Sequence, residues 1–349
     1  MIPGLYGNRL SDRKGITCGR SNRASRSVKA SVQHTLNDLS LSNPEQSVVL
    51  MAIELVDTVA VANVLGEGVL WNARQRSVWW TDIESSLLFE YDPNTNRLRS
   101  WDTPFRVACF GFTEDSDRLI VAFEHGIAFY DYATNNVEWL VAPGTLEEGL
   151  RFNDGKIDPA GRFWVGSMVE DTNVATTRGS LYCLDFNTGL LQRISGISIS
   201  NGLCWSPDGS VMYHADSAEH RIDAYDFDPV SGTVSGRRTF ARTSSGVHPD
   251  GSTVDREGSL WNAQWGGASV VRYRKDGQVD LTLELPVSQP TCVAFGGDDL
   301  ELLFVTSARA DLSDEALANE PAAGDLFIYR TDCNGLPAPS LSRSFVKNQ

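Results

Sequence analysis

The chain of 349 residues lacks any apolar run that could cross a membrane or serve as a secretory signal. Its nearest candidate, residues 48–56, is interrupted by Glu54 and followed by Asp57, whereas a membrane-spanning helix needs about 20 apolar residues. A secretory signal would also place a short basic start before a continuous apolar stretch. The sequence therefore gives no reason to expect a membrane partner.

Positive charge is also scarce. Thirty Lys and Arg stand against 45 Asp and Glu, which gives a formal net charge of -15. Nucleic acids and anionic membranes bind basic surfaces, so neither is expected as a partner. The deficit is uneven, because residues 1–50 carry +4 and the remaining 299 residues carry -19.

The basic segment, residues 1–50, shows neither helical nor strand periodicity. Met51 opens directly into strand-like sequence, so we interpret residues 1–50 as a disordered extension or as the result of a start codon upstream of Met51. An organelle transit peptide is a third reading, because such leaders are basic, rich in Ser and poor in acid. The predicted folded domain covers residues 51–349.

Closely spaced cysteines are missing as well. There is no CxxC pair and no neighbouring His, so the spacing does not indicate a zinc site. Reduced thiols are the default in a long chain without an export signal, and a cytoplasmic location follows as an expectation. A GxSxG nucleophile elbow and a P-loop are absent too, which argues against serine esterase chemistry and nucleotide binding. The cysteines are Cys18, Cys109, Cys183, Cys204, Cys292 and Cys333.

The acidic part contains six copies of one unit, each built from a turn-rich tetrad and three or four short strands. Starts roughly 40–50 residues apart with four strands each are typical of propeller blades. We predict an all-β six-bladed β-propeller, with four-stranded antiparallel blades around a central metal site. The alternative is a two-domain β-sandwich, which would not need repeats in phase. The units are 71–101, 112–141, 156–195, 203–240, 252–284 and 292–330.

Two segments outside this pattern lead to further predictions. Residues 52–64 precede the first unit and resemble a strand, which could complete the last blade and close the ring. A closed ring removes the exposed sheet edges of an open array. The one helix-like patch is at residues 313–317, inside the sixth unit.

An oxygen-bearing side chain recurs five residues before the turn tetrad in four units, and in the other two the position falls near Cys109 and Cys292. Equivalent positions at the start of innermost strands surround the propeller axis, so these side chains should converge. Two carboxylates and two amide carbonyls suit a hard divalent cation. The alternative is that Asn-Gly and Asp-Gly pairs are ordinary hairpin turns. The four side chains are Glu67, Asn153, Asn201 and Asp250.

Four long motifs contain these residues: LGEGVLWN (65–72), RFNDGKIDPAGRFWVGSM (151–168), ISNGLCWSPDGSVMYHAD (199–216) and HPDGSTVDREGSLWNAQWGG (248–267). They resemble the SMP-30/gluconolactonase/regucalcin family of six-bladed propellers. The resemblance extends from about residue 65 to residue 330 and looks closest to bacterial aldonolactonases.

The resemblance implies one divalent metal ion on the axis, which could be Ca, Zn, Mg, Mn or Fe. It implies Glu67, Asn201 and Asp250 as ligands, with Asn153 close enough to join them. Arg151 and Asn153 are implied to hold the substrate. Two weaker substrate candidates follow: an acidic residue after a loosely matching segment, Glu170 or Asp171, which the resemblance implies, and His214 of YHAD. His214 could line the pocket, but it could equally be a hydrogen-bonded histidine inside a blade.

The implied reaction is the metal-dependent hydrolysis of a sugar lactone, such as a glucono-, xylono-, arabinono- or galactonolactone, to the aldonic acid. The metal would polarise the carbonyl, and Asp250 would accept a proton from water. One alternative is an arylesterase or organophosphate hydrolase on the same scaffold, and another is a calcium-binding propeller without catalysis. The expected partner is the small sugar lactone, and the expected state is a monomer or weak homo-oligomer.

Overall fold

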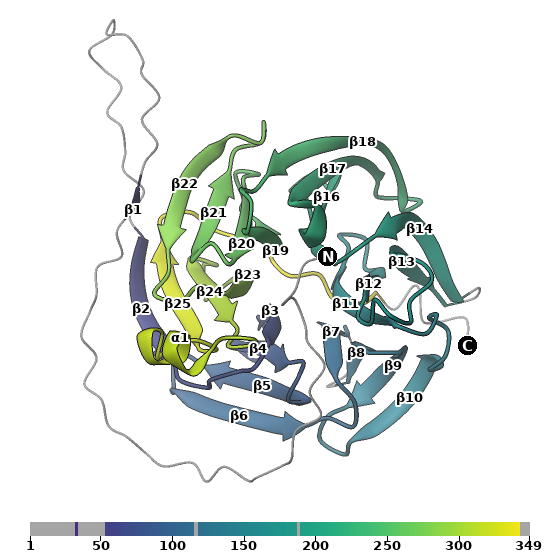
Figure 1. The fold of residues 1–349 in the computed structure, drawn as a ribbon, viewed down its shortest axis with the longest axis horizontal. Helices are drawn as coiled ribbons and strands as arrows, with labels where there is room; N and C mark the ends of the chain where they lie inside the picture. The colour runs from purple at the N-terminus through teal and green to yellow at the C-terminus, as the bar shows by residue number, and fades with distance from the viewer. Residues whose placement is uncertain (1–31, 34–52, 115–117, 187–188, 343–349) are drawn as a thin grey trace, which may run out of the picture.

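The computed structural model describes residues 32–33, 53–114, 118–186 and 189–342. Their strands form six antiparallel sheets arranged around one axis (Figure 1). The predicted six-bladed β-propeller is therefore confirmed. Of the predicted extension, only Val32–Gln33 (β1) is described, and it pairs with the outermost strand of one blade. The rest of residues 1–50 lies outside the described residues, so their interpretation stays a prediction.

Blades 1 to 3 each run from an inner to an outer strand in chain order. Blade 1 consists of β3 (Gly66–Asn72), β4 (Ser77–Asp82), β5 (Leu87–Asp92) and β6 (Arg97–Asp102). Blade 2 consists of β7 (Val107–Phe112), β8 (Leu119–Phe123), β9 (Gly126–Asp131) and β10 (Asn136–Val141). Blade 3 consists of β11 (Leu150–Ile157), β12 (Phe163–Val169), β13 (Gly179–Asp185) and β14 (Gly189–Ile197).

Blades 4 and 5 repeat this arrangement, and blade 6 closes the ring. Blade 4 consists of β15 (Ser200–Trp205), β16 (Val211–Asp216), β17 (Arg221–Asp228) and β18 (Thr233–Arg242). Blade 5 consists of β19 (His248–Val254), β20 (Leu260–Trp265), β21 (Ser269–Tyr273) and β22 (Val279–Glu284). Blade 6 consists of β23 (Pro290–Gly296), β24 (Leu302–Ser307), β25 (Leu326–Thr331) and β2 (Ile53–Val59).

Strand β2 is the outermost strand of blade 6, although it precedes all the other blade strands in the chain. It pairs antiparallel with β25, so that Ile53 faces Thr331 and Val59 faces Leu326. One blade thus combines segments from the beginning and the end of the described domain. The strand predicted within residues 52–64, and its role in closing the ring, are confirmed.

Both faces of each blade are buried against its neighbours, because successive side chains of a strand point to opposite faces. Strand β4 illustrates this. Val78 and Trp80 belong to the apolar cluster shared with blade 6, whereas Trp79 packs with Phe110 and other apolar side chains of blade 2. Burial on both faces explains why the inner strands contain so few exposed residues.

Each of the six innermost strands changes register against the next strand of its blade, near its beginning. Such a shift is a β-bulge, which inserts an extra residue, bends the strand and redirects its side chains. The bulges include or adjoin the positions that the repeat alignment selected. They therefore determine how those side chains are presented at one end of the axis.

The other end of the axis is covered by the segment that follows blade 6. Gly335 bridges to Asp255 of blade 5, and Leu341 bridges to Thr113 beside blade 2, so residues 335–341 cross the axis (Figure 1). A cavity of about 420 Å³ between this segment and the ring is lined by residues of all six innermost strands. The sequence did not indicate this crossing.

Two short helices lie outside the sheets, η1 (Ser217–Glu219) and α1 (Asp314–Asn319). Helix α1 confirms the helix-like patch at residues 313–317, and its N-cap is Ser313, whose hydroxyl accepts the Ala316 N–H at 3.2 Å. No helix in the described part of the chain is long and apolar enough to span a membrane.

Candidate active site on the propeller axis

A chain of hydrogen bonds links three innermost strands at the end of the axis where the β-bulges lie. Asn153 of β11 donates from Nδ2 to Oδ1 of Asn201 on β15, at 3.0 Å. Asn201 in turn donates to the Ser217 hydroxyl at 2.9 Å. That hydroxyl donates to the carbonyl oxygen of Pro249 at 2.7 Å, directly before Asp250 on β19. Both predicted amide positions are thereby fixed and connected to Asp250.

The two predicted carboxylates, Glu67 and Asp250, lie in this region and are almost fully buried, with 7% and 2% exposure. Burial, and then the negative charge of Asp154, raises the pKa of Glu67 to about 8. Burial and the charges of Glu67 and Asp154 raise the pKa of Asp250 well above its ordinary value. These side chains, far apart in sequence, are close enough to repel one another.

The donor set fits a bound cation. Oδ1 of Asp250 is buried and has no hydrogen-bond partner among the described residues, and an unsatisfied buried carboxylate is costly unless a cation compensates it. No group of three or more His, Cys, Asp or Glu side chains in the described ranges could hold a metal ion. The predicted set combines two carboxylates with two amides, and such oxygen donors suit a hard divalent ion.

At the equivalent positions of blades 2 and 6, close packing of the innermost strands takes the place of oxygen donors. A Cβ on Gly155 would lie 2.6 Å from Cys109 Sγ, and one on Gly251 would lie 2.5 Å from Cys292 Sγ. Glycine is therefore required at both positions, because neighbouring inner strands approach closely there. The repeat alignment had placed both cysteines near the equivalent positions.

Two charged residues of β11 belong to the same region and were missed by the sequence argument. Asp154 is buried and accepts the Leu203 N–H at 3.1 Å. Lys156 donates from Nζ to the carbonyl oxygen of Ser252 at 2.6 Å, which links β11 to β19. Asp154 directly follows Asn153, but the repeat alignment selects only one residue per unit. That Asp154 also belongs to this region follows from the β-bulge in β11, which the sequence alone does not reveal.

On the side toward blade 2, Arg151 is completely buried and donates to Oδ1 of Asn153 at 2.8 Å. Its Nε lies 3.3 Å from Glu170 Oε1, and Arg106 Nη1 lies 2.7 Å from the same carboxylate. Burial alone would raise the pKa of Glu170, but the two arginines outweigh it and hold the pKa below its ordinary value. The structure thus brings Arg151, Asn153 and Glu170 together and adds Arg106, which no motif had indicated.

His214 lies inside blade 4 on β16, with 2% exposure. Its Nε2 is 2.8 Å from the hydroxyl oxygen of Ser200 on β15. Burial lowers the pKa of His214 to about 4, which favours the neutral ring. These surroundings are those of an interior histidine, and contact with a substrate stays a prediction.

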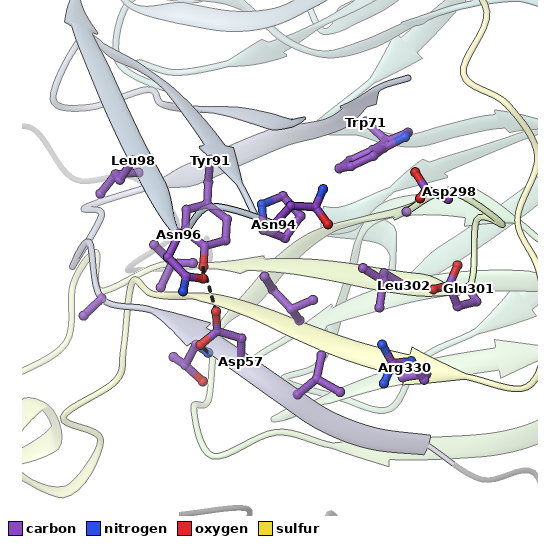
Figure 2. A pocket seen from close by; sticks show the side chains of 17 residues that line it. Asp57, Trp71, Tyr91, Asn94, Asn96, Leu98, Asp298, Glu301, Leu302 and Arg330 are labelled. Atoms are coloured by element: carbon purple, nitrogen blue, oxygen red, sulfur yellow. Dashed lines mark hydrogen bonds between the residues drawn. The ribbon is translucent and has the colours of Figure 1, made fainter. Parts of the chain in front are cut away.

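Another cavity lies away from this site, between blades 1 and 6. It has a volume of about 740 Å³ and is lined by residues of β2, the β5–β6 turn and the β23–β24 turn. Figure 2 shows Tyr91, whose hydroxyl oxygen is 2.7 Å from Asp57 Oδ2 and 2.8 Å from Asn96 Oδ1. None of the predicted site residues lines this cavity. We favour the axial site, because its buried carboxylates lie beside fixed amide and guanidinium donors.

Comparison with known proteins identifies the family of this chain. The model of the SMP-30/Gluconolactonase/LRE-like region matches residues 65–309. The chain is 40% identical to an L-arabinolactonase of Azospirillum brasilense, over 78% of this chain and 91% of that protein. It is 37% identical to a 6-deoxy-6-sulfogluconolactonase of Pseudomonas putida, over 79% and 94%. The crystal structure of regucalcin from Agrobacterium tumefaciens, described as a calcium-binding protein, superposes with a TM-score of 0.77 at 31% identity, over 82% of this chain and 98% of that one.

Proposed function

Because this chain belongs to the SMP-30/gluconolactonase/LRE-like family, we propose that it hydrolyses a sugar lactone to the aldonic acid with a divalent cation bound on the propeller axis. The observation that carries the proposal is the convergence of two buried, mutually repelling carboxylates with the Arg151–Asn153–Asn201 chain of hydrogen bonds. Relatives named as sugar lactonases support the same class of reaction.

In this proposal Glu67, Asn201 and Asp250 hold the cation, with Asn153 beside them. Asn201 would present its Oδ1, because its Nδ2 is committed to Ser217. When bound, the cation would polarise the lactone carbonyl and stabilise the negative charge that develops on its oxygen. Oxygen donors of this kind suit Ca²⁺, Mg²⁺ or Mn²⁺.

Asp250 would act as the general base. Its carboxylate is buried beside the other proposed ligands, so one oxygen would bind the cation while the other accepts a proton. One oxygen would accept the proton of the attacking water while the new C–O bond forms. The proton would then pass to the ring oxygen as the lactone C–O bond breaks, which restores the carboxylate.

Arg151 and Asn153 would orient the sugar. The guanidinium of Arg151 is held between Asn153 and Glu170, so it can donate to a lactone or hydroxyl oxygen without first being ordered. Preorganised donors lower the barrier because their ordering cost is met during folding. The carboxylate of Glu170, which the two arginines keep ionised, would accept a hydrogen bond from a sugar hydroxyl.

The test measures proton release from glucono-, xylono-, arabinono- and galactonolactone after chelation and after the return of single metals. We expect chelation to abolish turnover and one or more divalent ions to restore it. Asp250→Asn and Glu67→Gln should each lower kcat/KM by about 10²-fold or more. Asp226→Asn, a change at an exposed residue of β17, is the control and should retain activity.

Phenyl acetate and paraoxon are included to test the related ester chemistries. Turnover of these esters but not of sugar lactones would replace the proposed substrate class with an arylesterase or organophosphate hydrolase. Cation binding without hydrolysis of any of these compounds would indicate a binding protein. Lactone hydrolysis that survives chelation and both substitutions would overturn the proposed mechanism.

A further inference from the structure

A cavity of about 500 Å³ lies next to the candidate site, between the loop after blade 2 and the loop after β12. Its lining includes His125, residues 146–150, Glu170, Asp171 and Val174. Glu170 lines the cavity, and its carboxylate also contacts Arg151, which bonds Asn153. The cavity is therefore contiguous with the residues proposed to orient the sugar.

The two loops that form the cavity are tied to each other. The backbone N–H groups of Glu170 and Asp171 both donate to the carbonyl oxygen of Gly149, at 2.9 and 3.1 Å. The Thr177 hydroxyl donates to Glu147 Oε2 at 2.7 Å. These bonds connect the walls through backbone and side chain, so the cavity is already formed in the free protein.

The positive charges near this cavity are already neutralised. Arg106 forms ion pairs with Glu84, Glu124 and Glu170. Arg151 shares the Glu170 carboxylate. Three carboxylates thus surround two guanidinium groups, and an incoming anion would have to compete with them.

The lining itself adds further negative charge. Four of its side chains are carboxylates: Glu147, Glu148, Glu170 and Asp171. Among the lining residues, only His125 can carry a positive charge. Carboxylate oxygens accept hydrogen bonds from sugar hydroxyls, whereas they repel a sulfonate, a phosphate or another carboxylate.

We propose that this cavity receives the hydroxyl-bearing carbons of an uncharged sugar lactone and rejects lactones that carry an anionic substituent there. This inference rests on the proposed function and specifies its substrate class. Membership in the family does not decide the question, since one relative is named for a sulfonated gluconolactone and another for a neutral arabinolactone. The arrangement of charges in this chain favours the neutral kind.

The experiment compares glucono-1,5-lactone with 6-phosphoglucono-1,5-lactone, using the full-length protein loaded with its activating cation. At low ionic strength we expect kcat/KM for the phosphorylated lactone to be at least about tenfold lower, mainly through KM. The difference should shrink as salt is added, because salt screens charges at a partly exposed site. Turnover of the neutral lactone should change less than about twofold over the same salt range.

Glu148→Lys tests the charge directly, and Glu315→Lys is its matched control. Both residues are exposed and both substitutions change the net charge equally, but Glu315 lies on α1 beside blade 6 (Figure 1). Glu148→Lys should improve kcat/KM for the phosphorylated lactone about fivefold or more relative to the neutral one. Glu315→Lys should leave that ratio unchanged.

The outcomes separate this inference from the proposed function. Equal kcat/KM for the two lactones at low salt, or equal effects of the two lysine substitutions, would overturn the inference and leave the lactonase proposal standing. Absence of turnover with every lactone would overturn the proposed function and the inference with it. A selective gain in Glu148→Lys, together with the expected salt dependence, would support both.

Discussion

Asp250 carries a buried carboxylate oxygen that accepts no hydrogen bond from the described residues, next to the equally buried Glu67. Without a cation, such a pair lowers the stability of the folded state, because each charge is desolvated and repelled by the other. We predict that Asp250→Asn raises the free energy of unfolding of the cation-free protein by roughly 1–3 kcal/mol. Urea denaturation in the presence of a chelator measures this change.

The same substitution should reverse its effect when the activating cation is present. The wild-type protein should gain stability with cation concentration, as expected for a ligand that binds only the folded state, whereas Asp250→Asn should gain much less. Asp226→Asn on the exposed side of β17 serves as the control and should respond like the wild type. A cation-free Asp250→Asn protein less stable than the wild type would show that the carboxylate is satisfied in another way.

His214 provides a prediction about pH. Its pKa is about 4 in the folded protein, below the ordinary value of 6.5, because the ring is buried. The unfolded chain therefore binds a proton first as the pH falls, so the contribution of His214 to stability is complete above pH 6.5 and is lost between 6.5 and 4. The loss amounts to at most roughly 3 kcal/mol.

The measurement compares the unfolding free energy of the wild type with that of His214→Gln from pH 7 to pH 4.5. Gln can keep a hydrogen bond to the Ser200 hydroxyl but does not titrate, so the variant should lose less stability on acidification. Identical slopes for wild type and His214→Gln would contradict the assignment. A large rise in KM for the lactone in His214→Gln would instead support contact with the substrate.

The four oxygen-bearing side chains of the candidate site were predictable because they repeat, whereas Arg151 and Glu170 were implied by the resemblance to a family. Glu67, Asn201 and Asp250 share one offset from a turn tetrad. Because each repeat forms one blade, residues at the same offset lie around the propeller axis. Arg106 and Lys156 occur once each and contact the site only through folding, so no spacing within the chain could select them. Burial and mutual repulsion, which determine the pKa values of Glu67 and Asp250, likewise exist only in the folded protein.

The innermost strands depend on glycine where they approach one another. Gly202 of β15 has a φ of +62°, and a Cβ there would lie 3.0 Å from both the Asp250 carbonyl oxygen and the Ser252 hydroxyl oxygen. Gly202→Ala should therefore cost about 2–4 kcal/mol of stability, from backbone strain and displacement of β19. Because β19 carries Asp250, we also expect kcat/KM to fall about tenfold or more.

Gly196→Ala separates strain from displacement. Gly196 of β14 has a similar φ of +78°, but a Cβ there would meet nothing within 4 Å. This control should cost only about 1 kcal/mol and leave kcat/KM unchanged. Equal losses of activity in the two variants, measured by proton release alongside thermal unfolding, would contradict a specific link between Gly202 and Asp250.

The β-bulges of the innermost strands could not be predicted from the sequence of any one strand. Alternation of side chains located the strands, since residues that face neighbouring blades are apolar on both sides. A register shift depends on how two strands pair, and residues 152–155 of β11 show that it can bring two successive polar side chains into one site. The sequence of one strand does not contain that information.

At the scale of the whole molecule, the repeated units and the strand before them were sufficient to predict the closed ring. The crossing segment at residues 335–341 was not predictable, because it has no counterpart in the other units and its contacts are made to distant blades. It is short and rich in Pro, with Pro337 and Pro339 spanning the opening. Repetition therefore reveals the ring, whereas features that occur once require the folded structure.

Ring closure by β2 leads to a prediction about truncation. Deleting residues 1–51 keeps β2, whereas deleting residues 1–60 removes it, together with its pairing to β25 and the contact between Asp57 and Tyr91. The shorter deletion should change Tm by less than about 3 °C and kcat/KM by less than about twofold. The longer one should lower Tm by about 5–10 °C or more and promote association, because β25 becomes an exposed edge.

Thermal unfolding and size-exclusion chromatography of the two truncated proteins measure these effects, and the full-length chain is the reference. Both deletions remove Val32–Gln33 and its pairing with β22, so the difference between them isolates residues 52–60. If the shorter deletion alone destabilised or inactivated the protein, the basic segment would belong to the folded unit, and the division of charge between segment and domain would not mark a domain boundary. If the longer deletion were harmless, the hydrogen bonds and packing of the remaining blades would suffice to hold the ring closed.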